Sequence, residues 1–273
     1  MTGNPQPKPP RVNPGGGLIL KKFRKRLTPW LLPIVLIVYW QIAANMGWIN
    51  PRILPSPLNV FRAFVRLLMN GELLENVKVS CARAGLGFLI GGSIGLTLGL
   101  VTATWRFMET LLDTTLQMVR TIPNLALLPL VIIWFGIGEK AKVFLIVCGV
   151  TFPIYLNTFH GIRSVDLNLI SMARVYGLDR LALWRHVILP GALPSILVGV
   201  RFSLGVMWMT LIVAETIAAS SGLGYMASNA REMMQTDVIV LTILIYAFLG
   251  KLADVVARAL ERRFLSWRAV NAA

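Results

Sequence analysis

The chain has 273 residues, of which 56% are hydrophobic and only 14% are charged. Soluble domains carry about 25% charged residues, so this composition, with its long uncharged runs, indicates an integral membrane protein. The formal net charge is +15. The basic residues stand at the ends of apolar runs, which favours topology signals and contacts with lipid headgroups over a nucleic-acid-binding domain.

The N-terminal segment, residues 1–29, is rich in Pro and Gly and then basic. This composition predicts a disordered tail that stays in the cytoplasm. The segment resembles the start of a signal peptide, but it is long and the next apolar run continues to Trp48, so we expect an uncleaved membrane helix. A transmembrane domain would then cover 30–262, and 263–273 would form a cytoplasmic C-terminal tail.

Six apolar runs follow the tail, at roughly 30–48, 83–104, 116–137, 141–161, 194–218 and 237–257. A run of about 20 apolar residues crosses a hydrocarbon core of about 30 Å. The sequence therefore predicts an all-α membrane protein with six transmembrane helices. Most Lys and Arg residues fall on the side that holds both termini, which places both termini in the cytoplasm. Residues 57–69 are expected to form an amphipathic helix on the outer surface.

The second apolar run carries glycines at every fourth position, Gly87, Gly91, Gly95 and Gly99. These glycines share one helix face and leave it without side chains. The pattern predicts that a neighbouring helix packs closely against this face.

The chain contains none of the residue patterns typical of metal sites or catalysis. Cys81, Cys148, His160 and His186 form no CxxC, HExxH or mixed cluster, which indicates neither a metal site nor a disulfide framework. A GxxxxGK[ST] phosphate loop is also missing, so we expect no cofactor in this chain and no enzymatic activity of its own.

The polar segment between the fourth and fifth runs is too patterned for a simple linker. Ser164 is expected to cap a short helix at 166–176, which Gly177 would end in the left-handed conformation. Asp179 is expected to cap a second short helix, which Pro190 would stop. Two short helices that project from the membrane in this way predict a docking surface for a partner.

This segment contains the pattern Ser171-Met172-Ala173-x3-Gly177-x9-Val187-x-Leu189-Pro190. The pattern resembles the EAA loop of ABC importer permeases, EAA-x3-G-x9-I-x-LP. In that family the loop forms a coupling helix in a cleft of the ATP-hydrolysing subunit, so the resemblance implies that these residues contact an ATPase. The chain departs from the family pattern at Ser171, where Glu is usual, and at Met172, where Ala is usual, while Val187 replaces Ile.

Further stretches between residues 50 and 265 resemble the nitrate/sulfonate/taurine permease family, namely 53–57 (ILPSP), 134–137 (WFGI), 160–163 (HGIR), 214–217 (AETI) and 221–225 (SGLGY). The strings at 159–163 and 230–232 look closest to the aliphatic-sulfonate permeases. The resemblance implies a type I ABC importer permease in the bacterial inner membrane, with aliphatic sulfonates as substrates; taurine and nitrate remain open.

The same resemblance implies the partners of the chain. It would form a homodimer in the lipid bilayer and work with ABC ATPase subunits, which bind ATP and Mg, and with a periplasmic or lipid-anchored substrate-binding protein.

Two ionisable residues, Arg201 and Glu215, fall inside the fifth run. They are separated by about 21 Å along a helix and about 40° around it, with Gly205 and Trp208 on nearly the same face. This face is our hypothesis for the translocation path, in which Arg201 holds a passing sulfonate through charge-assisted hydrogen bonds. The structural alternative is that Arg201 extends to the cytoplasmic surface and that Glu215 pairs with another helix.

Arg120 and Pro123 stand at the mouth of the third run. Because proline removes a backbone hydrogen bond and permits a bend, a gate hinge is one hypothesis for this position. An ordinary kinked packing helix is the other.

Three other classes of protein fit the sequence less well. An ion-coupled secondary transporter would need coupling-ion residues at midplane and usually internal repeats, and the sequence shows no repeat. A membrane enzyme would need a catalytic set of residues, and a passive anchor would not explain the patterned loop. Whether uptake requires a nucleotide and a second subunit separates these classes.

Overall fold

The computed structural model describes residues 31–265, except for the side chain of Ala218. The expected tail at 1–29 lies outside the described residues, as does the part of the expected C-terminal tail from 266 onward. All regular elements in 31–265 are helical, as the composition predicted. The chain forms two compact units, divided in sequence between Asn59 and Val60.

The first unit contains the apolar helix Leu31–Asn45. The backbone N–H of Leu58 donates to Gln41 Oε1 at 3.1 Å, which ties the segment that follows back to this helix. The unit ends inside α2 (Pro57–Met69), the helix that the sequence predicted at 57–69. Val60, Ala63 and Leu67 are buried on α2 at helical spacing, so its amphipathic character is confirmed.

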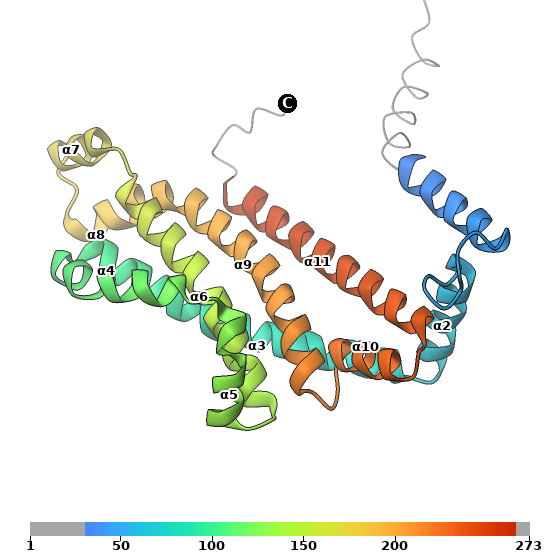
Figure 1. Cartoon of the computed structure of the whole chain (residues 1–273). Coiled ribbons are helices and arrows are strands. Elements are labelled where there is room, and N and C mark those ends of the chain that lie inside the picture. The colour runs from blue at the N-terminus through green and yellow to red at the C-terminus, as the bar shows by residue number, and fades with distance from the viewer. Residues whose placement is uncertain (1–30, 266–273) are drawn as a thin grey trace, which may run out of the picture. The chain divides into compact units, whose positions relative to one another are not determined.

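The second unit is built on four long helices, α3 (Glu72–Thr104), α6 (Glu139–Arg163), α9 (Leu189–Ala218) and α11 (Thr236–Phe264). α6 packs against both α3 and α9, and α9 also contacts α11 (Figure 1). Buried Ile146 and Val150 of α6 form an apolar cluster with Ala84 of α3 and with Met207 and Leu211 of α9. This cluster holds the centre of the bundle.

The glycine face of α3 lies directly against α6, as predicted. A Cβ atom added at Gly91 would lie 2.7 Å from the carbonyl oxygen of Val147, and one added at Gly99 would lie 2.6 Å from Thr158 Cβ. Such distances are shorter than van der Waals contact, so only glycine permits this approach of the two backbones.

The third predicted run, 116–137, is not one helix. The structure has α4 (Arg106–Thr121), the short helix η1 (Asn124–Leu127) and α5 (Leu128–Phe135), with a bend of 83° across the break. Ile122 is extended, with ψ 122°, because a residue before proline avoids the helical region. The break therefore follows from Pro123.

A short helix that the sequence did not predict, α10 (Leu223–Glu232), lies between α9 and α11. It packs against both of them and also contacts α3. Gly222 precedes it with a φ of 107°, a left-handed conformation that favours glycine. At 10 residues, α10 is too short and too polar for a membrane span.

Within residues 31–265, four helices are long and apolar enough to cross a membrane, Glu72–Thr104, Glu139–Arg163, Arg180–Ile217 and Thr236–Phe264. A fifth is added if α4 and the bent segment Asn124–Phe135 count as one span. Helix Leu31–Asn45 is apolar but shorter. The prediction of several membrane-spanning helices is confirmed, and the count of six stays a prediction.

Candidate functional site

Two short helices, α7 (Leu167–Val175) and α8 (Arg180–Leu183), lie between the end of α6 and the start of α9 (Figure 1). The residue that caps α7 is Asp166, whose carboxylate accepts from the backbone N–H of Asn168 at 2.8 Å. The prediction of Ser164 as the cap is wrong. Ser164 is instead the residue that ends α6, since its backbone N–H donates to the carbonyl of His160 and its hydroxyl donates to that of Gly161.

Gly177 ends α7 as predicted, with a φ of 80°. The backbone N–H of Gly177 donates to the carbonyl of Arg174, and that of Leu178 donates to the carbonyl of Ala173. This pair of bonds is the Schellman motif, which satisfies the last carbonyls of a helix and reverses the chain. Gly177 therefore sets the direction in which the chain leaves α7.

Asp179 caps α8, also as predicted, and accepts from the backbone N–H of Ala182 at 2.8 Å. Pro190, however, does not stop this helix. The chain continues through η2 (Trp184–Ile188), a π-helical segment, directly into α9. Pro190 stands in the first turn of α9, directly after the π-helical segment, so the helical chain continues past this proline.

The residues of the EAA-like pattern fall into two groups. Ser171 and Met172, which depart from the family pattern, are exposed on α7. Ala173 is buried, and Gly177 makes the turn. Val187 is half-buried in η2, while Leu189 and Pro190 begin α9. Ala173 and Gly177 match the pattern at positions that shape the segment, whereas the departures at Ser171 and Met172 lie on its surface.

The surface of this segment is strongly apolar. Exposed large side chains include Val175 at 87%, Tyr176 at 77%, and Leu167 and Leu181 at 76% each. A group of exposed apolar side chains on a protruding element marks an interaction site. The geometry therefore agrees with a docking surface between α6 and α9.

The four residues predicted on one face of α9 do not share one environment. Arg201 and Gly205 line a groove between α9 and α11. Trp208 packs against the central apolar cluster and lies edge-on to Tyr246, with ring centroids 6.3 Å apart. Glu215 is completely buried. Helical spacing gives the direction of each side chain around the axis of α9, but it does not show which of these directions the other helices cover.

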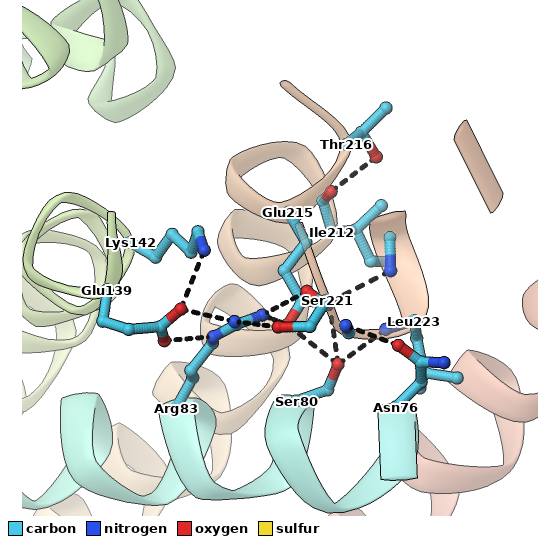
Figure 2. Close-up of polar contacts among 12 residues, drawn as sticks. Asn76, Ser80, Arg83, Glu139, Lys142, Ile212, Glu215, Thr216, Ser221 and Leu223 are labelled. Carbon is cyan, nitrogen blue, oxygen red and sulfur yellow. Dashed lines mark hydrogen bonds and ion pairs between the residues drawn. The ribbon is translucent and has the colours of Figure 1, made fainter. Parts of the chain in front are cut away.

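Glu215 belongs to a buried polar network that the sequence analysis missed (Figure 2). Arg83 of α3 lies between two carboxylates, with Nη1 2.7 Å from Glu215 Oε1 and Nε 2.5 Å from Glu139 Oε2. Lys142 adds a second cation at 3.0 Å from Glu139. The structural alternative for Glu215, pairing with another helix, is what the structure shows.

The same network holds the chain that enters α10. The N–H of Gly222 donates to Asn76 at 2.7 Å, and that of Leu223 donates to Ser80 at 2.9 Å. Ser80 in turn donates to Glu215, and Arg83 donates to the carbonyl of Ser221. A Cβ atom at position 222 would lie 2.6 Å from Arg83 Nη1. The network thus links α3, α6, α9 and α10 at the end of the bundle opposite α7.

The break at Pro123 is anchored by its neighbour Asn124. Its side-chain Nδ2 donates to the carbonyl of Leu145 in α6 at 3.1 Å and to Thr210 Oγ1 in α9 at 3.2 Å. Arg120, in the last turn of α4, and Pro123 are exposed. The structure therefore has a sharp bend at the expected position, and a gating role for Arg120 and Pro123 stays a prediction.

Comparison with known proteins identifies the family. Residues 95–266 match the family described as binding-protein-dependent transport system inner membrane component. The chain is 58% identical over 248 residues to a protein of Escherichia coli K12 named as the aliphatic sulfonates transport permease SsuC, covering 91% of this chain and 94% of that protein. It is 34% identical to the taurine transport system permease TauC of the same organism, covering 92% and 97%.

A solved structure shares the fold. A chain from the crystal structure of an amino acid ABC transporter superimposes with a TM-score of 0.60 at 18% sequence identity, covering 74% of this chain and 96% of that one. The several apolar helices and the family match make this chain a multi-pass inner membrane protein. With 172 matched positions spanning α3 to α11 and close relatives over nearly its whole length, the chain belongs to the family of binding-protein-dependent transport system inner membrane components.

Proposed function

We propose that this chain is the permease subunit of an ATP-driven ABC importer and forms the path for aliphatic sulfonates across the bacterial inner membrane. The observation that carries the substrate class is the identity of 58% to a permease named for aliphatic sulfonates, against 34% to one named for taurine. The exposed apolar surface of α7 and α8 supports the class of transporter, because it needs a partner to cover it.

The partner proposed for α7 and α8 is an ABC ATPase subunit. The chain contains no phosphate-binding loop, so ATP and Mg would bind to that subunit and not to this chain. Met172, Val175 and Tyr176 would enter a cleft of the ATPase, while the turn at Gly177 fixes their direction. Movement of the ATPase would then reach α6 and α9, which are joined directly to this segment.

This partnership also orients the chain. With α7 and α8 in the cytoplasm, the positive-inside rule places both termini there as well. The network around Arg83 and Glu215 would face the outer side, where a periplasmic or lipid-anchored binding protein delivers the substrate. One copy provides one wall of a path, so we propose a homodimer in the lipid bilayer, by analogy with the fold.

The test is uptake of labelled alkanesulfonate into vesicles that contain this chain, its ATPase and its binding protein. We expect uptake that requires ATP and that unlabelled alkanesulfonates inhibit better than taurine or nitrate. Inhibition mainly by taurine or nitrate would support an ABC importer with that anion as its substrate. Uptake without ATP or without the ATPase would favour an ion-coupled secondary transporter and refute the proposal.

A further inference from the structure

A groove of about 530 Å³ lies between α9 and α11. Its lining is mostly apolar, with Val198, Phe202, Leu204, Val206 and Met209. Phe202 and Met209 are 63% and 73% exposed, so they line the groove without being covered by other helices of the chain. Volumes of this size are typical of sites for small molecules.

A cluster of charges lies near one end of the groove. Arg201 Nε donates to Asp254 Oδ1 at 2.9 Å, and Arg258 forms an ion pair with Asp254 at 2.6 Å. Lys251 and Glu261 lie nearby, at 3.7 Å from Asp254 and 4.0 Å from Arg201. Three cations therefore share two carboxylates, which leaves a net positive charge that favours an anion.

Arg201 has donors available for such an anion. Among the described residues its only hydrogen bond comes from Nε, and Nη1 lies 4.0 Å from Glu261 Oε2, so Nη2 keeps donors for oxygen atoms that enter the groove. Its side chain is 44% exposed, and it stands near the middle of α9. An ionisable group within a membrane-spanning helix usually faces a cavity or a partner, and such groups often mark a substrate pathway.

Two glycines make the space next to the charged end. Gly205 and Gly250 both line the groove, and an added Cβ atom at either one would have no atom within 4 Å. Gly205 follows Arg201 by four residues and Gly250 precedes Asp254 by four. Because α9 and α11 are consecutive spans that run in opposite directions, the two glycines lie at one level, about 6 Å beyond the charged pair.

We infer that this groove binds a small anion with an alkyl tail, with the sulfonate at Arg201 and the tail between Gly205 and Gly250. The inference rests on the proposed function and deepens it, since it assigns the selection of tail length to the permease itself. The apolar lining extends from Arg201 to Met209, about 12 Å along the helix. Each CH2 that the groove removes from water strengthens binding roughly fourfold. A long alkyl tail that fills the groove should therefore bind more tightly than a short one.

The test fills the groove from each side. Gly205→Leu and Gly250→Leu add a side chain beyond the charged pair, and Gly85→Leu is the matched control, because Gly85 on α3 also has no atom within 4 Å of an added Cβ. Uptake of octanesulfonate and of ethanesulfonate is measured for each variant with the same ATPase and binding protein. Because the ATPase and the binding protein are unchanged, any change in the ratio of octanesulfonate to ethanesulfonate uptake is caused by the permease.

We expect both groove variants to lower the octanesulfonate-to-ethanesulfonate ratio by about tenfold or more, the loss of two or more buried CH2 groups. Gly85→Leu should keep the wild-type ratio, and Arg201→Gln should lower uptake of both compounds together. Because Gly250→Leu reaches the groove from the other helix, it decides the outcome if Gly205→Leu does not assemble.

Other occupants give different results. An unchanged ratio in both groove variants overturns the inference while leaving the proposed function in place. If anionic phospholipid fills the groove, uptake by the wild type should depend on that lipid and uptake by the groove variants should not. The octanesulfonate-to-ethanesulfonate ratio would then be the same in all of them. A groove filled by the second copy would make both variants monomeric by light scattering in detergent. Each of these results also overturns the inference, whereas wild-type vesicles without ATP-dependent sulfonate uptake refute the proposed function.

Discussion

Glu215 is a fully buried ionisable residue, and hydrogen-bond donors surround its carboxylate. Its carboxylate accepts from Ser80, Arg83, the N–H of Gly224 and Tyr246, at 2.7 to 3.1 Å. A buried carboxylate is tolerated only when its charge is paired and its oxygen atoms are bonded. Glu215 meets both conditions, so pairing and hydrogen bonding explain how its buried charge is tolerated, and a role in the translocation path stays a prediction.

We predict that Glu215→Gln destabilises the folded protein by about 3–5 kcal/mol, the usual cost of removing one partner of a buried ion pair. The change keeps the size of the side chain and leaves the charge of Arg83 compensated only by Glu139. Thermal unfolding of the purified complex in detergent measures the effect. Glu232→Gln, at an exposed position in α10, is the control, and an equal effect of the two changes would contradict the prediction.

A second pair of variants separates charge from packing in the same network. If burial of unpaired charge causes the loss, Arg83→Met combined with Glu215→Leu should be less destabilising than the sum of the two single changes, because neither charge is left alone. Additive losses would mean that the two residues act independently.

At the scale of elements, the segment α7–α8 depends on the backbone at Gly177. An added Cβ atom there meets nothing within 4 Å, so a substitution tests the left-handed conformation and not a steric clash with a neighbour. A β-branched residue adopts that conformation with difficulty, whereas Asn adopts it more readily than other residues. The two substitutions therefore differ mainly in the direction that they allow for the chain after α7.

We predict that Gly177→Val lowers sulfonate uptake while ATP hydrolysis and membrane insertion continue, because α7 no longer points into the ATPase. The ratio of phosphate released to sulfonate imported should rise at least severalfold, given a backbone cost of about 1–2 kcal/mol. Gly177→Asn should stay close to wild type. Wild-type uptake by Gly177→Val would refute the coupling role of this segment.

In the second unit of the molecule, α6 runs between the two ends of the bundle. Val175, after α6, is 87% exposed, and Ile137, before α6, is 76% exposed. Since α6 is long and apolar enough to span a membrane, these two positions should face opposite compartments. Cys81 and Cys148 are both free, so a labelling experiment needs a background without them.

We predict that, in a chain with Cys81→Ser and Cys148→Ala, a membrane-impermeant maleimide labels Ile137→Cys in right-side-out vesicles and Val175→Cys only in inside-out vesicles. Addition of the ATPase should protect Val175→Cys, since that position would lie in the interface. The reverse pattern of labelling would invert the proposed orientation, and labelling of both from one side would contradict the assignment of α6 as a span.

The sequence by itself determined the features that depend on neighbours along the chain. The apolar runs at 141–161 and 237–257 lie within α6 and α11, because length and hydropathy are local properties. The amphipathic helix at 57–69, the glycine face of α3 and the turns at Gly177 and Asp179 were predicted for the same reason. Two other local predictions, Ser164 as the cap of the first short helix and Pro190 as the stop of the second, were wrong, since α6 extends to Ser164 and α9 continues through Pro190.

Only the tertiary structure decided which residues meet across the bundle. Arg83 and Glu215 are 132 residues apart, and no periodicity within one helix reveals such a partner. The bonds of Asn124 beside the bend likewise join it to residues of α6 and α9 that are far from it in the sequence. Helical spacing in the sequence placed Arg201, Gly205, Trp208 and Glu215 on one arc of α9. It did not show which part of that arc faces the groove and which part is buried, because spacing determines the direction of a side chain and not its neighbours. The packing of α3 and α11 against α9 decided this.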